Sequence, residues 1–584
     1  MAIPSATLTI QDGSLGISPP SSGNTSVVTG VCSKGIPNTI YGGFRDITTL
    51  VSTLGYGPAV EAAALQILMG ATVYVAVVTP TYDGAASAVT FVGSGAGRVS
   101  TPSFAPLEQI TVVCTTAGTL ATAAFTFARG TGAASAPVVS AAGWATGFVV
   151  PGTMTSLAFT EGTGFDAGDT FTISTLGVIT QTANGAGGHT GTIATQTSQP
   201  VDDFTGRVEI RLTGSKTVAT FRYTLDYFLD DGGNDLSTWS SDIIIPTGLK
   251  YALPNTGIFL TFSDASYTDG DTHDFTTIAS GVSTSNVTAA FTALYAQASL
   301  SYKFAHVVAM STSAAGAATL AGVIDTNMST AQAAFRYVRA FMDVPTVGTR
   351  ILSGGAPIAD TADTDSVVAA AFAALDESRV VWGAGDFLCI SAVNGRLCRR
   401  PASWQGAMRA AGTVRLAENL HRVRSGALKN VRKLYRDEAA TEALDAARFL
   451  TLRTHIGKQG YYITRGRTGA VSTSDFSRLA NAFVMDRACT IARAKGVDLI
   501  GDDVNVNDDG TITEKAAATV ETEINKALTE GLVDTLDASA AYVTVSRTAN
   551  VLSTATAPIS VRVKPKGSFD FVEFTMGFIV PSAA

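Results

Sequence analysis

The side chains that most often carry catalysis are few in this sequence and stand far apart. Five histidines occur, and none lies in the HExxH spacing or in another spacing that holds a metal. There is no GxSxG turn for a serine nucleophile and no GxxxxGKS or GxxxxGKT loop for a nucleotide phosphate. Nucleophilic, zinc-hydrolase and nucleotide-hydrolysing chemistry therefore lack their usual carriers, and we expect no enzyme, no catalytic residue, no metal and no cofactor.

The five cysteines are odd in number and scattered, with no CxxC pair. A disulfide framework or a thiolate zinc site would need a paired pattern, so neither is indicated and a reducing compartment is favoured. The cysteines are Cys32, Cys114, Cys389, Cys398 and Cys489.

Aspartate-rich turns offer the one cation-binding possibility. If Gly510 were the sixth position of an EF-hand loop, Asn505, Asn507 and Asp509 would fit ligand positions, but the twelfth position is Ala516 where a bidentate Glu is needed. A solvated turn is the favoured interpretation. Two further pairs could ligate calcium, although aspartates that shape turns explain them more simply: Asp166 with Asp169, and Asp269 with Asp271.

Charge is strongly segregated near the C-terminal third. Residues 396–436 hold eleven Lys and Arg against the single acid Glu418, whereas residues 498–537 hold eleven acids against two lysines. These segments could be two solvated faces, or complementary patches that meet between subunits or against a charged partner. The candidates for a basic patch that faces a partner or a neighbouring subunit are Arg399, Arg400, Arg409, Arg415, Arg422, Arg424, Lys429, Arg432 and Lys433.

The overall composition bounds the class of protein. The 584 residues are 46% hydrophobic and only 15% charged, which suits burial against neighbouring copies. A net charge of -8 argues against a dedicated nucleic-acid binder, and no aromatic residues interleave the basic segment. The first residues lack a signal-peptide pattern, and no apolar run approaches a membrane span. We expect a protein made in the cytosol with no membrane insertion and no direct nucleic-acid partner.

The elements that must position these residues begin with an α/β pattern over residues 1–80. Asp46 is a good N-cap for a helix that ends at Leu54 and Gly55, a second helix runs from Pro58 to Met69, and the apolar run 73–78 predicts a strand covered on both faces. The same texture returns from about residue 281. There we expect helices over 286–299, 315–337 and 364–375, and strands over 304–310, 380–382 and 387–390. The flanking parts could form one body that the intervening segment interrupts.

Residues 81–280 instead show short Thr, Val and Phe runs between Gly, Asp and Ser, the pattern of all-β modules. An internal repeat lies within them. Residues 118–127 match 214–223, Trp144 before Pro151 matches Trp239 before Pro246, and the Leu-x-Phe and Asp-rich pattern of 157–170 recurs over 260–272. Three matches in one order predict two tandem β modules joined by the Gly/Thr-rich stretch 179–202.

The last hundred residues predict a further unit. One amphipathic helix follows the cluster 472–475 and closes at Gly496, and a second spans 517–528 and closes at Gly531. Three β-like runs follow over 542–547, 559–563 and 569–580.

These patterns together resemble the contractile tail sheath proteins of phages, tailocins and contractile injection systems. The N-terminal block resembles the family's first unit, Phe341-Met342-Asp343-Val344-Pro345 its strand ending in Asp-x-Pro, and Arg400-Pro401-Ala402-Ser403-Trp404-Gln405-Gly406-Ala407 its Pro-x-Ser segment before a helix. The stretches 461–468, 561–565 and 571–580 resemble later strands. The resemblance covers roughly residues 1–80 and 300–584, whereas the family's Tyr-Pro pair is missing from 382–390 and the repeat has no counterpart in the shared core.

The resemblance implies a fold class and a division of the chain. We expect an α/β (α+β) sheath core interrupted by an inserted all-β region with two tandem repeated β modules. The expected units are an N-terminal arm (1–25), the first part of the core (26–80), a β module with its linker (81–202), a second β module (203–280), the second part of the core (281–460), and a C-terminal inner domain with a C-terminal arm (461–584).

The implied function is structural. The subunit would polymerise with copies of itself as a six-fold helical sheath around a tail tube protein, bounded by baseplate and tail terminator proteins, and would contract to drive the tube through a cell envelope. Assembly would take place in the host cytoplasm, and the final location would be the virion tail or a contractile particle. Arms from both chain ends would add strands to neighbouring subunits, although either end could instead pair within its own subunit. The arm candidates are Ile3, Leu8, Ile10, Ile17, Phe571, Val572, Phe574, Phe578 and Ile579.

Two other classes stay open at this point. The repeated β modules could belong to a receptor-binding or glycan-binding surface protein, although no trimerising or anchoring segment is visible. An enzyme with a novel site is the third reading. Negative-stain microscopy separates a sheath protein from a binding module, because a sheath gives hollow striated cylinders and a binding module gives discrete particles.

Overall fold

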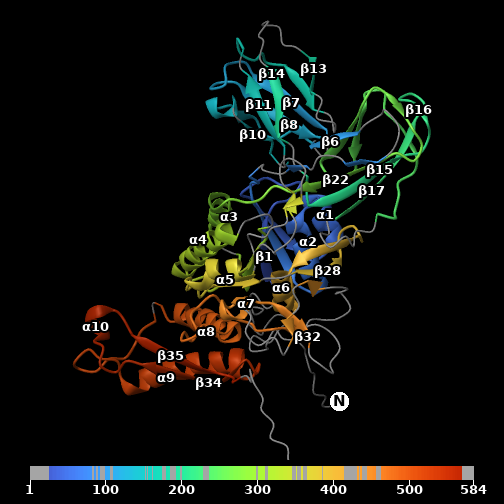
Figure 1. Ribbon diagram of the computed structural model, residues 1–584. Coiled ribbons are helices and arrows are strands. Elements are labelled where there is room, and N and C mark those ends of the chain that lie inside the picture. The colour runs from blue at the N-terminus through green and yellow to red at the C-terminus, as the bar shows by residue number, and fades with distance from the viewer. Residues whose placement is uncertain are drawn as a thin grey trace, which may run out of the picture.

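The computed structural model describes residues 25–81, 85–86, 90–92, 99–104, 109–145, 147–151, 153, 155–160, 162–173, 179–183, 192–197, 200–227, 236–297, 300–309, 314–344, 350–351, 357–358, 365–383, 386–412, 431–432, 435–436, 443–454, 462–500 and 502–567. Three regions follow one another along the molecule (Figure 1): a β-rich segment, an α/β body in the middle, and a C-terminal unit of helices and two strands. The α/β segments on both sides of the β-rich segment lie in the same body.

The α/β body is built on a six-stranded sheet with the order β2-β3-β1-β23-β24-β27. Strand β1 pairs in parallel with both β3 and β23, so chain segments that precede and follow the β-rich segment share one sheet, as the sequence predicted. The edge strand β2 is antiparallel to β3. The strands are β1 (Thr25–Gly30), β2 (Ile40–Phe44), β3 (Thr72–Val77), β23 (Phe304–Val307), β24 (Arg339–Asp343) and β27 (Val380–Gly383).

Helices and small sheets surround this sheet. The predicted cap of α1 is confirmed, because Asp46 accepts a hydrogen bond from the Thr49 N–H at 2.8 Å and Gly55 follows the helix at φ 70°. The helices are α1 (Ile47–Leu54), α2 (Pro58–Leu68), α3 (Thr284–Ala296), α4 (Ala314–Ala333), α5 (Asp365–Ala373), α6 (Ala402–Gly412) and α7 (Ala443–Ala446). The remaining strands are β25 (Arg350–Ile351), β26 (Pro357–Ile358), β28 (Asp386–Ile390), β29 (Leu397–Pro401), β30 (Val431–Arg432), β31 (Tyr435–Arg436), β32 (Leu452–Thr454) and β33 (Tyr462–Ile463).

The described residues between 85 and 278 form strands and one short 3-10 helix, η1 (Ala142–Ala145). The strands before residue 200 are β4 (Ala85–Ala86), β5 (Thr90–Val92), β6 (Val99–Phe104), β7 (Ile110–Thr116), β8 (Ala124–Arg129), β9 (Val138–Val139), β10 (Phe148–Val149), β11 (Ser156–Thr160), β12 (Thr170–Ile173), β13 (Ile179–Ala183) and β14 (Thr192–Thr197). Those after it are β15 (Phe204–Ile210), β16 (Gly214–Ser215), β17 (Thr220–Tyr227), β18 (Ile243–Ile244), β19 (Lys250–Leu253), β20 (Ile258–Phe262), β21 (Ser266–Tyr267) and β22 (Thr272–Ile278).

Strand pairing repeats within this segment. The order β12-β7-β8-β9 in one sheet has the same connections as β22-β15-β17-β18 in another. A serine marks the equivalence. The Ser135 N–H donates to the Phe127 carbonyl of β8 and its hydroxyl accepts from the Phe127 N–H, and Ser240 makes the same two bonds to Tyr223 of β17. The two tryptophans of the sequence repeat are not equivalent: Trp144 is buried and stacks on Phe148 at 3.8 Å, whereas Arg222 covers the half-buried ring of Trp239 at 4.3 Å.

Strands β4, β5 and β6 come before the earlier part in the chain but pair with the later part, β4 and β5 with β22 and β6 with β20. Strand β14 instead pairs with β11 within the earlier part. The buried side chains divide accordingly. Those from Ile110 to Ile173 form a core of their own, whereas those from Val201 to Phe275 belong to the same core as the α/β body.

The C-terminal unit consists of α8 (Leu479–Asp498), α9 (Glu514–Leu528), a π-turn (Thr529–Val533), β34 (Ala538–Val545), α10 (Val551–Thr554) and β35 (Ile559–Pro565). Both helices were predicted, but both ends of the first were wrong, because α8 begins after the N-cap Arg478 and continues through Gly496 to Asp498. The predicted run 569–580 lies outside the described residues. None of the helices that the structure describes is both long and apolar enough to cross a membrane.

Candidate functional site

Two of the sequence motifs meet at Asp343, at the carboxyl end of β24. Its carboxylate accepts hydrogen bonds from the Ser403 hydroxyl at 2.6 Å and from the Trp404 indole N–H at 3.0 Å, both at the start of α6. All three residues are buried. Because a buried carboxylate needs donors around it, the Asp-x-Pro and Pro-x-Ser motifs act together and fix α6 against the central sheet.

The same carboxylate ends a buried polar chain through the body. His306 of β23 lies 3.3 Å from Asp343 through Nε2 and 3.1 Å from the Gln66 side chain through Nδ1, and Gln66 in turn accepts from the Ser26 hydroxyl at 2.6 Å. This set contains serine, histidine and aspartate, the residue types of a nucleophilic triad. However, Ser403 bonds to the aspartate and not to His306, and the side chains are enclosed in the core. The geometry therefore serves packing of α2, β1, β23 and α6.

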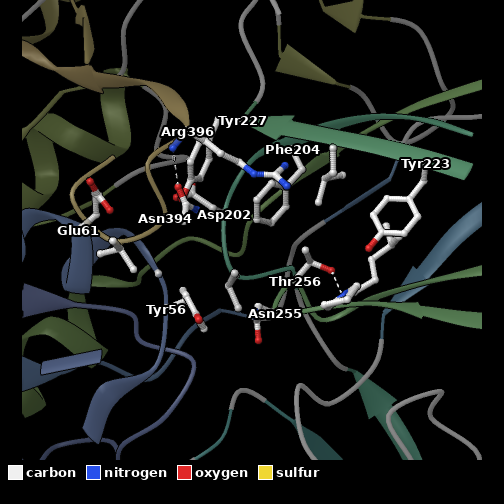
Figure 2. Close-up of a pocket in the computed structure, with 16 residues that line it drawn as sticks. Tyr56, Glu61, Asp202, Phe204, Tyr223, Tyr227, Asn255, Thr256, Asn394 and Arg396 are labelled. Carbon is white, nitrogen blue, oxygen red and sulfur yellow. Dashed lines mark hydrogen bonds between the residues drawn. The ribbon is translucent and has the colours of Figure 1, made fainter. Parts of the chain in front are cut away.

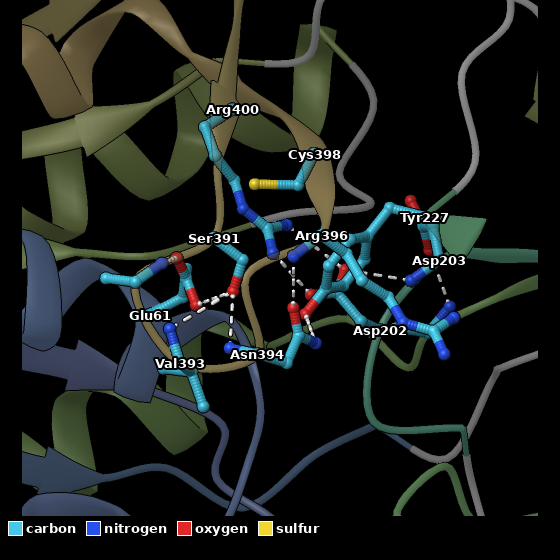
Figure 3. Close-up of polar contacts among 12 residues, drawn as sticks. Glu61, Asp202, Asp203, Tyr227, Ser391, Val393, Asn394, Arg396, Cys398 and Arg400 are labelled. Atoms are coloured by element: carbon cyan, nitrogen blue, oxygen red, sulfur yellow. Dashed lines mark hydrogen bonds and ion pairs between the residues drawn. The ribbon is translucent and has the colours of Figure 1, made fainter. Parts of the chain in front are cut away.

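A second buried cluster joins the α/β body to the β-rich segment (Figure 3). Arg400 on β29 donates two hydrogen bonds to the Asp202 carboxylate, at 2.8 and 3.2 Å, and its guanidinium lies over the ring of Tyr227 at 4.8 Å. Burial by itself lowers the pKa of Arg400, but Asp202 and its other neighbours raise it well above its usual value, so the guanidinium stays charged.

Arg400 corrects one prediction about the basic patch. Its residue is 2% exposed, so within the folded subunit it cannot face a tube or a neighbouring subunit. The charge pattern alone could not reveal this, because its acidic partner Asp202 lies 198 positions away in the β-rich segment.

Glu61 of α2 forms the third part of this cluster. Its carboxylate accepts a hydrogen bond from the Ser391 hydroxyl at 2.8 Å and one from the backbone N–H of Ala392 at 2.6 Å, both in the turn between β28 and β29. Burial raises the pKa of Glu61, and the nearby Arg400 partly offsets that effect. In the same turn, the Asn394 amide donates to the Tyr227 hydroxyl at 2.7 Å. One hairpin thus holds α2 on one side and the β-rich segment on the other.

A cavity of about 290 Å³ opens beside the cluster (Figure 2). Its lining combines tyrosines from both regions with polar side chains of the hairpin turn. Tyr56 comes from the α/β body, Tyr223 and Tyr227 come from β17, and Asn394 and Arg396 come from the turn. Burial raises the pKa of Tyr223 to about 12, so its hydroxyl stays protonated at neutral pH. The cavity marks the seam between the two regions.

A third contact joins the C-terminal unit to the body. Arg339 of β24 pairs with Asp486 of α8 at 2.7 Å, and Lys303 lies over the Phe483 ring at 5.2 Å. Burial raises the pKa of Asp486, and Arg339 lowers it in part. Each end of the body therefore carries a largely buried arginine-aspartate pair that holds the adjoining region.

The remaining predicted site residues are only partly described. Arg409 lies half-buried on α6, and for Arg399 and Arg432 only the backbone is described. Outside the described residues lie the other members of the basic patch and all arm candidates: Arg415, Arg422, Arg424, Lys429, Lys433, Ile3, Leu8, Ile10, Ile17, Phe571, Val572, Phe574, Phe578 and Ile579.

The aspartate-rich turns have local hydrogen bonds. Asp509 accepts from both the backbone N–H and the hydroxyl of Thr511, and Gly510 has φ 80°. Asp169 accepts from the Asp166 N–H at 2.9 Å. No group of three or more His, Cys, Asp or Glu side chains within the described part of the chain is arranged to hold a metal ion.

These contacts define a mixed α/β protein in which buried ion pairs join regions that are distant in sequence. Residues 3–467 match the model of the DUF2586 N-terminal domain, and the chain belongs to this family. No curated protein matches the chain.

Solved structures with similarity to the chain include a sheath tail protein, a baseplate chain and a sheath chain. A sheath tail protein from Desulfitobacterium hafniense is 11% identical with a TM-score of 0.40, and the match covers 96% of this chain and 100% of that one. A chain of the anti-feeding prophage baseplate is 13% identical with a TM-score of 0.33, over 49% of this chain and 73% of that one. A chain of the contracted PVC sheath, part of an extracellular contractile injection system, is 13% identical with a TM-score of 0.30, over 41% and 63%.

Proposed function

We propose that this protein is a sheath subunit of a contractile tail, which polymerises around a tail tube and shortens to drive the tube through a cell envelope. The observation that carries the proposal is the isolated two-stranded sheet of the C-terminal unit. Among the residues that the structure describes, β34 pairs only with β35, and β35 only with β34. The sheet packs on the core of the subunit through Val543, Val561 and Val563, but within the described residues its outer edges carry no further strand, and an unpaired edge is a template for a strand from another chain.

The outer edge of β34 has free positions for such a strand. The Ser546 N–H bonds to Pro558 across the hairpin, whereas the Val545 N–H points the other way and donates to Glu521 of α9. By the alternation of an antiparallel strand, the N–H groups of Val543 and Ala541 also point to the outer edge. Glu521 covers that edge at Val545, and the stretch before it is available for strand addition.

The surface of this unit is apolar for a solvent face. Several large side chains are well exposed, and Tyr542 on β34 is 60% exposed. Such exposure is expected of surfaces that neighbouring copies cover. The exposed apolar residues of the unit include Val497, Ile500, Leu536, Tyr542, Leu552 and Ile559.

The proposed occupants of these edges are the two chain ends. Their apolar residues stand among Ser, Thr and Pro, as in a segment that pairs through its backbone and places alternate side chains in pockets. Strands that stay paired keep subunits tied while the rigid bodies re-dock during contraction. The energy of contraction then resides in subunit packing, which fits a sequence without a nucleotide-binding loop.

The other partners follow from the same assembly. The sheath would be six-fold and helical, with baseplate and tail terminator proteins at its ends, in a virion tail or contractile particle assembled in the host cytoplasm. The basic segment 396–436 and the acidic segment 498–537 would meet across subunits or at the tube. Arg400 has no part in that contact.

The β-rich segment would decorate the sheath surface as two repeated β modules. The pairings of β6 and β14 support a nested arrangement, in which the first module, residues 110–197, interrupts the second. The second module would then comprise β15 to β22 together with β4, β5 and β6. In the first module β13 and β14 come last in the chain, whereas their equivalents in the second module would come before β15. The second module would therefore be a circular permutant of the first.

Removal of the N-terminal arm tests the proposed function. The chain without residues 1–20 should be folded by circular dichroism and monomeric by light scattering, whereas the full chain should give hollow striated cylinders in negative stain. Unimpaired polymerisation of the shortened chain would refute the arm mechanism. Discrete particles from the full chain would refute the sheath itself.

A single substitution tests the same edge in the full chain. Val543→Pro removes an outward N–H and leaves the β34-β35 ladder intact, because edge positions tolerate proline. We expect polymerisation to fail. The matched variant Val543→Ala keeps the N–H and should polymerise; equal behaviour of the two variants would exclude strand addition at this edge.

A further inference from the structure

Two cysteines stand directly opposite each other in the hairpin that joins the regions of the molecule. Cys389 on β28 pairs in register with Cys398 on β29, and their sulfur atoms lie 3.5 Å apart. Both side chains are buried. The sequence pattern did not suggest this pair, because eight residues separate the two and only the hairpin register brings them together.

The backbone geometry suits a covalent link. Residues directly opposite in an antiparallel pair have Cα atoms about 4.5 to 5.5 Å apart, and disulfides span about 4.4 to 6.8 Å between Cα atoms. The sulfurs are already in contact, so closing the bond needs a shift of about 1.5 Å. A metal is a poorer explanation, since two thiols without further ligands do not fill a zinc site.

We propose that Cys389 and Cys398 form a reversible disulfide, a redox modification site that ties the two strands of the junction hairpin together. Hydrogen peroxide is the oxidant that we assign, because it is small enough to enter a buried site. One thiolate attacks a peroxide oxygen, which breaks the O–O bond, forms a sulfenic acid and releases hydroxide. The second thiol attacks that sulfur, which forms the S–S bond and releases water. The sulfurs lose two electrons and the peroxide gains them, and with the thiol protons the products are the disulfide and two waters.

The position of the link gives it a consequence for the whole subunit. The strands it joins carry Ser391 and Asn394 at the turn and Arg400 beyond Cys398, the residues that bond to α2, to Tyr227 and to Asp202. A cross-link limits the opening of this hairpin. The junction between the α/β body and the β-rich segment is therefore firmer in the oxidised protein than in the reduced one.

The chemistry of the site sets the rate. Hydrogen bonding to Cys389 and burial both raise the pKa of Cys398, so at neutral pH little thiolate is present. Oxidation is slow in the closed hairpin and speeds up with rising pH.

Peptide mapping of the full chain tests the proposal. Folded protein is treated with hydrogen peroxide at pH 8, quenched in acid, blocked with an alkylating agent and digested with trypsin. Cys389 then lies in the peptide 380–396 and Cys398 in 397–399. The expected product is these two peptides linked, about 2 Da lighter than their sum, and dithiothreitol should restore the separate peptides.

Controls separate a built site from general oxidation. Cys389→Ser and Cys398→Ser should each abolish the linked peptide, whereas Cys489→Ser, at a half-buried cysteine, should leave it unchanged. Backbone hydrogen exchange across 386–401 should slow about threefold or more on oxidation of the wild type, and not in either serine variant of the pair. A linked peptide that forms only after denaturation, or oxidation confined to Cys489, would overturn the proposal. Both outcomes are measured on the wild-type chain, so they do not depend on whether the serine variants fold.

Discussion

The guanidinium of Arg400 meets the carboxylate of Asp202 at 2.8 Å in a buried ion pair, although 198 positions separate them in the chain. Arg400 lies on β29 of the α/β body, and Asp202 lies just before β15 of the β-rich segment. This pair therefore fixes the β-rich segment on the α/β body. A buried pair of this kind adds little net stability over apolar packing, but removal of one partner leaves an uncompensated charge in the core.

Asp202→Asn should therefore destabilise the chain by about 3–5 kcal/mol, because it leaves the Arg400 charge buried without its partner. The measurement is urea unfolding of the full chain, with limited proteolysis at the junction as a local readout. Asp264→Asn is the matched control. It breaks an ion pair between Asp264, whose side chain is 67% exposed, and Lys216. The loss in unfolding free energy should be less than about 1 kcal/mol.

The double variant Asp202→Asn with Arg400→Met distinguishes charge from packing. It removes the stranded charge and keeps an apolar side chain of similar reach beside Tyr227 and Trp404. We expect most of the loss in the single variant to be recovered. If the double variant is as unstable as Asp202→Asn alone, burial of an unpaired charge is not the cause.

Asp343→Asn tests the meeting of the two sequence motifs. The asparagine amide has one oxygen and one N–H₂ group, so it can accept a hydrogen bond from Trp404 or from Ser403 but not from both. In either orientation one donor in the core stays unsatisfied. The expected cost is about 1–3 kcal/mol by urea unfolding. Ser403→Ala removes one hydrogen bond without leaving a donor, and should cost less. A larger loss of stability in Ser403→Ala than in Asp343→Asn would show that Asp343 does not organise this site.

Excision of the nested module tests how the β-rich segment is built. Phe104 lies opposite Ile258 in the register, and the Val201 N–H donates to Thr256, so the chain leaves and returns within a few residues. Replacing residues 106–199 by a short Gly/Ser linker should leave a soluble chain with an intact Arg400–Asp202 junction. Size-exclusion chromatography and hydrogen exchange at β15 and β22 check this outcome. An unfolded remainder would show that the two parts depend on one core.

Local signals in the sequence were sufficient for much of the body. Asp46 before an amphipathic run and Gly55 after it define α1, since a cap and a helix stop act within a few residues. The continuous apolar run at 73–78 likewise identifies the largely buried strand β3, which spans Thr72–Val77. The end of α8 was missed because Gly496 stays helical. The helix runs on to Asp498 although Gly496 has no packing neighbour within 4 Å of its Cβ position and Val497 is exposed, so a glycine near a helix end is not by itself a stop.

The junction could not be predicted, because its partners are distant in sequence. Nothing near Arg400 indicates Asp202, and the basic run around it resembles a solvated surface. The tryptophan match failed for a related reason. Trp144 and Trp239 have similar neighbours in sequence, but the equivalence of Ser135 and Ser240 aligns Trp239 with Ala134, and Trp144 lies further along the chain in the 3-10 helix η1. Equivalence in a repeat depends on ladder register, which composition does not specify.

The final prediction concerns pH and the C-terminal unit. Hydrogen bonds from Arg547 and from the Val545 N–H lower the pKa of Glu521 to about 2, from an ordinary value of 4.5. A lowered pKa means that the folded chain binds fewer protons than the unfolded chain between these values. The contribution of Glu521 to stability is therefore full above about pH 4.5 and is lost as pH falls toward 2. Glu521→Gln should remove this dependence, so the difference in unfolding free energy between wild type and variant should shrink from pH 5 to pH 2. Glu523→Gln, at an exposed position of the same helix, serves as control and should show no such change. A wild-type to Glu521→Gln difference that stays constant across this range would contradict the stabilisation of the Glu521 carboxylate by Arg547 and the Val545 N–H.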